Sequence, residues 1–356
     1  MPRRPAVLAL AVAAALIAAA VLAVTAAVPA ADPPAAAAPA PAAEAPKTAL
    51  PDGWRWQEEP GKSVALVGPK GILWQFHFDP DQHLPYFDPV ATVDGRSLTQ
   101  NSPADHAWHH ALWFAWKFIN GVNYWETDKK TGKSDGRTAW TGARATTRPD
   151  RTARIEMDLA YHPAGAAGAT GAASAAGAAA EPVMTEKRIM DVSAPDAAGA
   201  YHIDWTATFT AGKADVTLDR TPLPGEPGGK GYGGYAGLSV RFAADMTDRA
   251  ATSTDGPVTL QGTTYRGKHA AVDYSGVVGG QPAGIAILDH PTNLNAPSPW
   301  YVIIAKPMSF FTPAVLCYGP HTLAAGQSLT LRYRVLVHPG RWDAERLKRE
   351  VARFAR

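Results

Sequence analysis

The chain has 356 residues, of which 34 are Lys or Arg and 32 are Asp or Glu, so its formal net charge at pH 7 is only +2. This balance gives no electrostatic reason to expect binding to nucleic acid or to an anionic membrane surface. Hydrophobic residues make up 46% of the chain, which is ample for a core, and the one cysteine, Cys317, excludes an internal disulfide. We therefore expect the partner to be a neutral small molecule.

The first thirty residues have the features of a secretory signal peptide. Arg3 and Arg4 precede an Ala/Leu/Val run over residues 6–24, and the small residues that follow suit signal peptidase. The sequence thus predicts an exported protein, periplasmic or extracellular. Because the run is about long enough to cross a bilayer, an uncleaved N-terminal membrane anchor is the alternative. No other stable membrane span is expected.

Composition divides the rest of the chain into three parts. Residues 31–50 are almost entirely Ala and Pro and predict an extended linker. Residues 51–342 predict one large β-sandwich domain, in which the Ala/Gly/Ser run at 164–180 is expected to be a disordered loop. Residues 343–356, with apolar side chains at helical spacing, predict a short C-terminal helix.

Short runs of alternating apolar residues, bounded by Gly, Pro, Asp and Asn, recur through the expected domain. They lie at residues 72–78, 155–161, 201–209, 236–242, 285–288 and 329–337. In the last run Leu331, Tyr333 and Val335 alternate with Arg332 and Arg334, which is the period-two pattern of a half-buried antiparallel strand. Many strands without alternating helices favour an all-β antiparallel sandwich over an α/β fold.

The segment from Asp105 to Trp125 is the densest in groups that can do chemistry. It contains three histidines, a carboxylate, two carboxamides and several aromatic rings. A purely structural strand would have little use for the histidines. We therefore expect this segment to form a wall of a binding site.

This segment is also part of a resemblance that spans residues 54–340. The further matching motifs lie at residues 265–270, 284–291, 293–295, 299–301 and 331–340. Together they resemble the PmoA-like family, bacterial proteins catalogued as "methane oxygenase PmoA" whose activity is unassigned. The family name is a poor guide to function, because the true methane monooxygenase subunit is an integral membrane protein. Nothing after residue 30 of this chain could supply a membrane span. The resemblance implies an extracytoplasmic β-sandwich related to the mutarotase-like carbohydrate enzymes.

Two local structures are open for the three histidines. Ser102-Pro103-Ala104-Asp105 has the form of a helix capping box, and a helix would place the histidines on one face, suited to a divalent metal. A strand would instead point His109 and His110 to opposite faces. Metal-free acid–base or substrate-binding roles are favoured over a metal site, and structural hydrogen bonding is the remaining alternative. The cofactor is therefore unknown, with a divalent metal not favoured and no residue assigned to one.

The leading hypothesis is a carbohydrate- or glycoside-processing protein, an isomerase or a lyase/hydrolase if it is an enzyme. One acid–base group would remove a proton while another supplies one. The residues expected to be catalytic are His109, His110, Asp105, Asp289 and His290. Those expected to bind substrate are His106, Trp113, Asn123, Lys268, His269, Asp273, Asn293 and Trp300.

Two alternatives belong to other functional classes. A non-catalytic sugar-binding module would keep the aromatic platform, and a metal-dependent enzyme or metal carrier would use His106, His109 and His110 as ligands. No G-x-S-x-G motif, Walker loop, dinucleotide fingerprint or Cys-based metal motif is present, which disfavours serine hydrolases, nucleotide enzymes and zinc-finger-type modules. If the enzyme hypothesis holds, the three histidines should share one cleft with His290 or His269.

Overall fold

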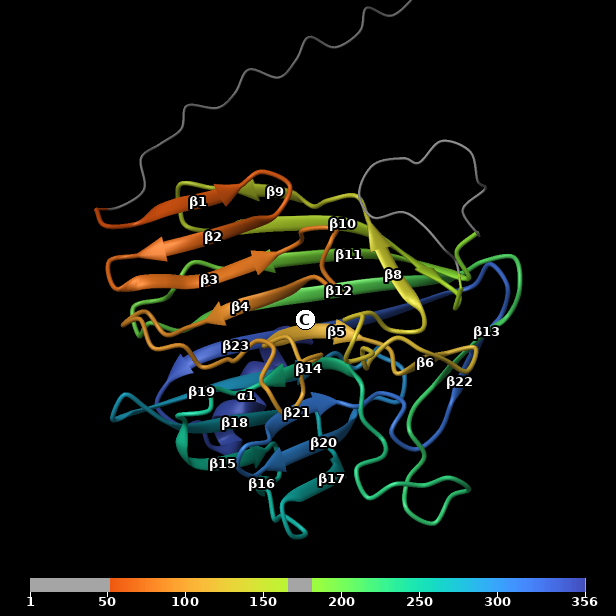
Figure 1. Cartoon of the computed structure of the whole chain (residues 1–356). Coiled ribbons are helices and arrows are strands. Elements are labelled where there is room, and N and C mark those ends of the chain that lie inside the picture. The colour runs from red at the N-terminus through yellow and green to blue at the C-terminus, as the bar shows by residue number, and fades with distance from the viewer. Residues whose placement is uncertain (1–51, 166–180, 356) are drawn as a thin grey trace, which may run out of the picture. The chain divides into compact units, whose positions relative to one another are not determined.

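Residues 52–165 and 181–355 are described by a computed structural model, in which they form three antiparallel β-sheets and one helix (Figure 1). The expected all-β sandwich with a short C-terminal helix is confirmed. The expected signal peptide at 1–30, the linker at 31–50 and residues 166–180 of the expected loop lie outside the described residues.

The two large sheets take their strands from the whole described chain. The nine-stranded sheet contains, in spatial order, β1 (Arg55–Glu59), β2 (Ser63–Gly68), β3 (Gly71–His77), β4 (Tyr86–Val90), β5 (Leu112–Ala115), β14 (Gly237–Arg241), β21 (Ser309–Pro313), β20 (Pro299–Ile304) and β17 (Thr264–Lys268). The ten-stranded sheet contains β16 (Gly256–Pro257), β15 (Thr247–Ser253), β18 (Ala271–Val278), β19 (Gln281–Asp289), β23 (Ser328–Pro339), β12 (Tyr201–Ala211), β11 (Met184–Val192), β10 (Ala153–His162) and β8 (Arg137–Trp140), with β9 (Arg144–Thr147) also paired to β10. A small third sheet contains β22 (His321–Leu323), β13 (Val216–Asp219), β6 (Phe118–Ile119) and β7 (Val122–Asn123).

The period-two pattern of the sequence becomes the burial pattern of the strands. Along β12, buried and half-buried residues alternate without interruption from Tyr201 to Ala211. Trp205 of β12 lies opposite Tyr333 of β23 and Met190 of β11, and all three side chains are buried. Because successive side chains of a strand point to opposite faces, this register directs one apolar row into the core.

The core lies between the two large sheets, and each sheet also has an outer face. In β5, Leu112 and Phe114 join the core, whereas Trp113 and Ala115 point to the outer face of the nine-stranded sheet. Side chains therefore alternate between the two faces along β5, which ends at Ala115, and β6 begins only at Phe118. The nine-stranded sheet is therefore packed on both faces.

The helix covers the outer face of the ten-stranded sheet. Helix α1 (Ala344–Phe354) begins at Asp343, whose carboxylate accepts a hydrogen bond from the Arg346 amide (2.7 Å). Its buried Leu347 packs with residues of β18, β19 and β23, and Figure 1 shows α1 behind β18 and β19. Within the described ranges, no helix combines the length and apolar character needed to cross a membrane.

Candidate functional site

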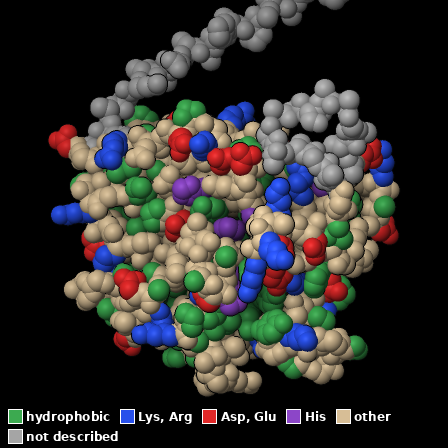
Figure 2. Space-filling view, in the orientation of Figure 1, with side chains coloured by type: hydrophobic (Ala, Val, Ile, Leu, Met, Phe, Trp, Pro, Cys, Tyr) green, Lys and Arg blue, Asp and Glu red, His purple; other side chains and the backbone are tan. Residues whose placement is uncertain are grey.

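Four histidines lie together on the outer face of the nine-stranded sheet. This histidine cluster consists of His83, His106, His109 and His110. His109 packs against Trp113, with ring centroids 5.1 Å apart, and His110 stacks on Tyr86 at 5.0 Å. Both aromatic partners belong to the apolar group that covers this face, on the side away from the core. Figure 2 looks onto this face and shows histidine side chains near its middle.

Two consecutive turns, not a helix, carry three members of the cluster. The His106 amide donates to the Pro103 carbonyl (3.0 Å), and the His109 amide donates to the His106 carbonyl (2.9 Å). The expectation that Ser102–Asp105 form the capping box of a helix is wrong. Ser102 has a left-handed backbone (φ 47°) instead of the extended one that a helix N-cap needs, and its hydroxyl donates to the Ala107 carbonyl (2.9 Å).

Ala111 explains why two adjacent histidines reach the same side of the sheet. Its φ of 54° lies in the left-handed region, which interrupts the alternation of an extended strand. The ring centroid of His109 lies 5.1 Å from that of Trp113, and the ring centroid of His110 lies 6.3 Å from it. The expectation that a strand would direct His109 and His110 to opposite faces is therefore wrong.

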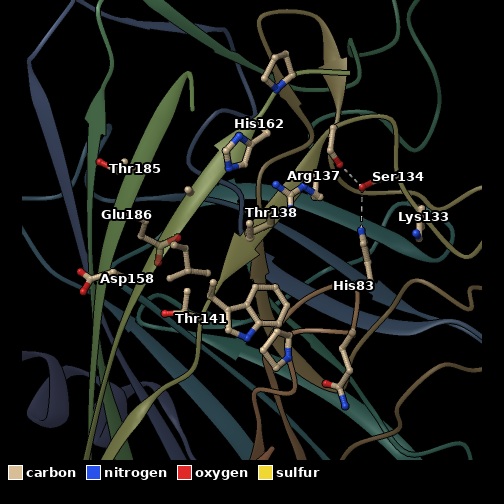
Figure 3. A pocket seen from close by; sticks show the side chains of 18 of the residues that line it. His83, Lys133, Ser134, Arg137, Thr138, Thr141, Asp158, His162, Thr185 and Glu186 are labelled. Atoms are coloured by element: carbon tan, nitrogen blue, oxygen red, sulfur yellow. Dashed lines mark hydrogen bonds between the residues drawn. The ribbon is translucent and has the colours of Figure 1, made fainter. Parts of the chain in front are cut away.

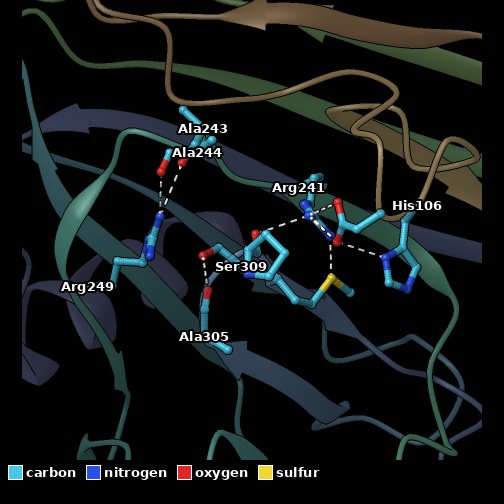
Figure 4. Close-up of polar contacts among 10 residues, drawn as sticks. His106, Arg241, Ala243, Ala244, Arg249, Ala305 and Ser309 are labelled. Atoms are coloured by element: carbon cyan, nitrogen blue, oxygen red, sulfur yellow. Dashed lines mark hydrogen bonds and ion pairs between the residues drawn. The ribbon is translucent and has the colours of Figure 1, made fainter.

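Asp105 connects the cluster to a buried arginine (Figure 4). Nη2 of Arg241 donates to both carboxylate oxygens of Asp105, at 2.8 and 2.7 Å, and Nδ1 of His106 lies 2.9 Å from Oδ2. The side chain of Arg241 is fully buried, whereas those of Asp105 and His106 are 24% and 36% exposed. Burial raises the pKa of Asp105, but the hydrogen bonds from Arg241 and His106 outweigh burial and lower it. The ionised carboxylate holds the proton of His106 on Nδ1 and leaves Nε2 as an acceptor.

His109 is enclosed by aromatic rings. It is buried, and the ring centroids of Trp113, Phe310 and Trp125 lie 5.1, 5.3 and 5.8 Å from its own. Its Nδ1 atom is buried without a hydrogen-bond partner among the described residues. Burial, with repulsion from His106, lowers the pKa of His109 well below its usual value. The ring is therefore neutral at physiological pH.

His110 and His83 form a second arm of the cluster. Nδ1 of His110 lies 3.0 Å from Oδ1 of Asn101, and Nδ2 of Asn101 donates to the Tyr86 hydroxyl (3.1 Å). On the other side, Nε2 of His110 lies 3.4 Å from Nδ1 of His83, and Nε2 of His83 lies 3.1 Å from Oγ of Ser134. Burial lowers the pKa of His110 to about 3 and that of His83 to about 4. Both rings are neutral above these values.

A lysine–glutamate pair, which sequence reasoning missed, borders the cluster. Nζ of Lys117 contacts Oε2 of Glu126, and the Tyr235 hydroxyl donates to Oε1 of Glu126 (2.7 Å). Trp125 contacts both Tyr235 and His109, with ring centroids at 5.3 and 5.8 Å, so it separates the pair from the cluster. Burial lowers the pKa of Lys117, although Glu126 opposes this shift. The available signal was a lysine directly after an aromatic, apolar strand.

The side chain of Asn123 stabilises the turn that contains Trp125 and Glu126. Its Oδ1 accepts from the Trp125 amide (2.9 Å), from the Glu126 amide (3.3 Å) and from Nζ of Lys117 (3.3 Å). An Asn in a turn commonly satisfies nearby backbone groups in this way. Asn123 therefore orients Lys117 and the turn, and the expectation that it binds substrate directly is not supported.

A pocket of about 1500 Å³ opens beside His83 (Figure 3). Its walls come from β8, β10 and β11 and from the segments at 80–83 and 131–136. Just over half of the residues that line it carry a hydroxyl or a charged group, and Trp140 adds an aromatic surface. His83 belongs both to the pocket and to the histidine cluster, so the two regions are continuous.

Asp289 and Asn293 fasten a turn and do not join this site. Asp289 accepts from the Ser298 amide and from Nδ2 of Asn293, both at 2.7 Å. Asn293 also bonds the amide and the carbonyl of Arg332, each at 2.7 Å. Both side chains are buried, and burial raises the pKa of Asp289 to about 6. The catalytic role expected for Asp289 and the binding role expected for Asn293 are wrong, because the polar atoms of both side chains are already hydrogen-bonded to each other and to the backbone.

Asp273 and His290 lie on the outer face of the ten-stranded sheet. The buried Asp273 contacts Nε2 of His338 (2.9 Å), and the His338 ring stacks on Trp342 at 3.9 Å. His290 meets the ring of Phe354 in α1, with centroids 5.3 Å apart. Both sheets and the core separate these residues from the histidine cluster. The expectations of a catalytic His290, a substrate-binding Asp273 and a cleft shared with His290 are therefore wrong.

Lys268, His269 and Trp300 are also remote from the cluster. Trp300 is a core residue whose Nε1 donates to the His269 carbonyl (2.8 Å). The His269 ring lies 2.8 Å from Asp255 and 2.6 Å from the Tyr265 hydroxyl. Lys268 is exposed at the end of β17, the edge strand that β14, β21 and β20 separate from β5. Because these three residues are remote from the histidine cluster, the binding roles expected for them are wrong. The alternative of a cleft shared with His269 is wrong for the same reason.

The three histidines that a metal site would have used do not converge. His106 faces Asp105, whereas His110 faces His83 and Asn101. In the part of the chain that the structure describes, no group of three His, Cys, Asp or Glu side chains is arranged to hold a metal ion.

A family model matches residues 68–352 of the chain, and it describes a family of unknown function, DUF6807. The chain belongs to this family. The DUF6807 match includes the whole histidine cluster, Arg241 and the Lys117–Glu126 pair. No curated protein matches the sequence. Membership of DUF6807 thus supports the unity of residues 68–352 but no particular activity, which has to be argued from the site.

Proposed function

We propose that the protein is an exported enzyme that processes a carbohydrate or glycoside by acid–base chemistry on the outer face of the nine-stranded sheet. The observation that carries this proposal is the Arg241–Asp105–His106 arrangement, in which a buried guanidinium fixes a carboxylate and the carboxylate orients an accessible imidazole. The signal-like residues 1–30 support export, and the resemblance to the PmoA-like family, which implies a relation to mutarotase-like carbohydrate enzymes, supports the substrate class.

His106 is the best placed acid–base group of the cluster. Its side chain is 36% exposed, so a substrate can reach Nε2, while Asp105 stabilises the imidazolium that forms after proton transfer. His109 and His110 were the expected acid–base residues, but burial lowers their pKa values and makes them weak bases. We assign these two rings to the floor of the site.

The Lys117–Glu126 pair, which borders the cluster beyond Trp125, is our candidate for the second group that the reaction needs. Because burial lowers the pKa of Lys117, its ammonium group is a stronger acid than an exposed lysine. In ring opening of a cyclic sugar, His106 would remove the proton of the anomeric hydroxyl while Lys117 donates a proton to the ring oxygen. The reverse transfers close the ring, so no proton is gained or lost over the cycle.

Half-buried aromatic rings near the two groups provide a surface for a sugar. Trp108 packs edge-on against His106 with centroids 5.2 Å apart, and Tyr235 lies beside Glu126. The buried Trp125 supports this surface through its contacts with His109 and Tyr235. Flat rings offer apolar contact to the faces of a sugar, while the polar groups at their edges set its orientation.

A sugar-binding module without catalysis is the second candidate. The specific observation in its favour is that His109 and His110, the central rings of the cluster, are buried and neutral. In that case the same aromatic surface would bind a sugar, but no proton transfer would follow.

The test combines tryptophan-fluorescence titration with a panel of mono- and disaccharides and NMR detection of their interconversion. His106→Gln should leave the dissociation constant nearly unchanged and lower kcat by about 10²–10⁴-fold, because it removes proton transfer but keeps the side-chain volume. His202→Gln is the matched control, since His202 also faces an aspartate, Asp204 at 3.8 Å, but lies on the other sheet.

Three results would contradict or redirect the proposal. Unchanged turnover in His106→Gln would remove the catalytic assignment. Sugar binding without any interconversion would favour the binding module. Stoichiometric metal in the purified protein that His106→Gln loses would favour the metal-dependent alternative.

A further inference from the structure

Ser134, His83 and His110 form a chain of two successive polar contacts at the margin of the pocket. Oγ of Ser134 is 3.1 Å from Nε2 of His83, and Nδ1 of His83 is 3.4 Å from Nε2 of His110. The three residues come from separate segments: the β3–β4 connection, the turns before β5 and the β7–β8 connection. Figure 3 shows the Ser134–His83 contact at the pocket wall.

The hydrogen-bond partners of His110 determine which atom donates and which accepts in each of these contacts. The amide nitrogen of Asn101 donates to Tyr86, so its carbonyl oxygen accepts the Nδ1 proton of His110. A neutral imidazole has one proton, and Nε2 of His110 must then accept the Nδ1 proton of His83. Nε2 of His83 consequently carries a lone pair directed at Ser134.

We propose that Ser134, His83 and His110 form a catalytic triad that hydrolyses a carboxylic ester bound in the pocket. Ser134 is the nucleophile, His83 is the general base and His110 orients His83. The arrangement of a nucleophile, a base and an orienting group within hydrogen-bond reach is the geometric signature of nucleophilic catalysis. This activity shares only His110 with the site of the proposed carbohydrate chemistry, where His110 has no proton-transfer role, and it does not rest on that chemistry.

Each step balances with groups that are present. Oγ of Ser134 attacks the ester carbonyl carbon as its proton passes to Nε2 of His83. The carbon–oxygen bond to the alcohol breaks, and the alcohol leaves with the proton from His83. Water then attacks the acyl-serine, gives a proton to His83 and releases the carboxylic acid while the proton returns to Ser134.

Ser134 and its neighbours have the freedom and charge that these steps require. The Ser134 hydroxyl can donate either to the Gly136 carbonyl (2.5 Å) or to His83, so a rotation about one bond activates it. Lys133 and Arg137 line the same pocket and provide positive charge for the oxyanion of the tetrahedral intermediate. Burial lowers the pKa of His83 to about 4, so its ring is unprotonated at neutral pH but is also a weaker base than an exposed histidine. The role of His83 as general base therefore rests on its position between Ser134 and His110.

The pocket lining indicates the alcohol part of the ester. The acidic Asp81, Asp135 and Asp158 are matched in number by the basic Lys133, Arg137 and Lys187, and the fourth carboxylate, Glu186, pairs with the buried Arg188, so no strong field selects a charged ligand. Thr138, Thr141 and Thr185 add hydroxyl groups beside Trp140. This combination of hydroxyls and one aromatic surface fits an uncharged polyhydroxy ester, such as an O-acylated carbohydrate.

The first experiment treats the full-length protein with a fluorophosphonate probe and maps the adduct by peptide mass spectrometry. We expect one adduct per chain, on Ser134. Ester hydrolysis is followed with p-nitrophenyl acetate in the same preparations. Ser134→Ala should abolish labelling and reduce hydrolysis to the rate of buffer, and His83→Gln should slow labelling by about 10²–10⁴-fold.

Ser193→Ala is the matched control, since Ser193 is also half-buried but accepts a bond from the His202 amide away from the pocket. It should label and hydrolyse like the wild type. An adduct on another residue, no adduct on the wild type, or wild-type hydrolysis by Ser134→Ala would overturn the triad. The peptide map of the wild type decides the matter even if a variant fails to fold.

Discussion

Arg241 and Asp105 form an ion pair in which one guanidinium nitrogen donates to both carboxylate oxygens, at 2.8 and 2.7 Å. The arginine has no exposed side-chain surface, and the Pro307 carbonyl lies 3.1 Å from the same nitrogen. A buried charge is costly without its partner. Asp105 is therefore held against the sheet, and the position of His106 follows from it.

The first prediction concerns this pair. Asp105→Asn should lower the free energy of unfolding by about 2–3 kcal/mol, because the buried guanidinium loses its counter-charge. Urea unfolding measures the change. The double variant Arg241→Met/Asp105→Asn should be less destabilised than the sum of the single variants, since neither unpaired charge then remains. Additive losses would show that the two residues are not coupled.

The second prediction concerns acid. Burial lowers the pKa of His110 in the folded protein to about 3, below the ordinary value of 6.5. As the pH falls, His110 is therefore protonated in the unfolded chain before it is protonated in the folded protein. Stability should therefore fall as the pH drops from 6.5 towards 3, and His110 should cost about 2 kcal/mol between about pH 7 and pH 5. Guanidinium unfolding at both pH values measures the loss. His110→Gln should flatten this dependence, and an equally steep dependence in the variant would refute the assignment.

The third prediction separates the two tryptophans that the sequence proposed for sugar contact. Trp113 and Trp300 are both fully buried, so replacing either with alanine should lower the free energy of unfolding by about 3–5 kcal/mol. Only Trp113→Ala should also weaken sugar binding, because Trp113 supports the histidine cluster whereas Trp300 lies in the core. Calorimetry near 10 °C, with both variants folded, compares their affinities. Equal losses of affinity would place the binding surface elsewhere.

The fourth prediction concerns Lys117 as the acid. The carboxylate of Glu126 raises the pKa of Lys117 against the effect of burial. Glu126→Gln should therefore lower the pKa of Lys117 and move the alkaline limb of the kcat–pH profile to lower pH, since the acid must be protonated. Glu156→Gln removes a half-buried carboxylate that pairs with the exposed Arg144 on the other large sheet and serves as the control. An unmoved alkaline limb would exclude Lys117 as the proton donor.

Much of the fold was predictable because strand periodicity is a local signal. The alternation in residues 201–209 and 329–337 led directly to β12 and β23, and the spacing of Leu347, Val351 and Phe354 led to α1. The density of histidines at 106–110 likewise predicted a cluster. These inferences depend only on neighbours within a few residues.

Other parts of the site were not predictable, because they depend on strand order and on single backbone angles. Nothing local shows that β17 is an edge strand or that His290 faces α1. The left-handed Ala111 is also invisible in sequence, since alanine rarely adopts this conformation. Arg241 and His83 come close to the histidines at 106–110 only because strands far apart in the sequence pair with one another.

Both faces of the nine-stranded sheet are packed, and this has a consequence for ligand binding. Tyr86, Trp113 and Phe310 stand on strands whose opposite faces are anchored in the core, so folding has already restricted their rotation. Trp113 and Phe310 pack against His109, which in turn contacts the half-buried His106 and Trp108. A ligand that settles over His106 and Trp108 therefore encounters a preorganised surface and loses little additional side-chain entropy on binding. Free and ligand-bound forms should therefore share nearly the same backbone, with adjustment confined to the loops that border the rings.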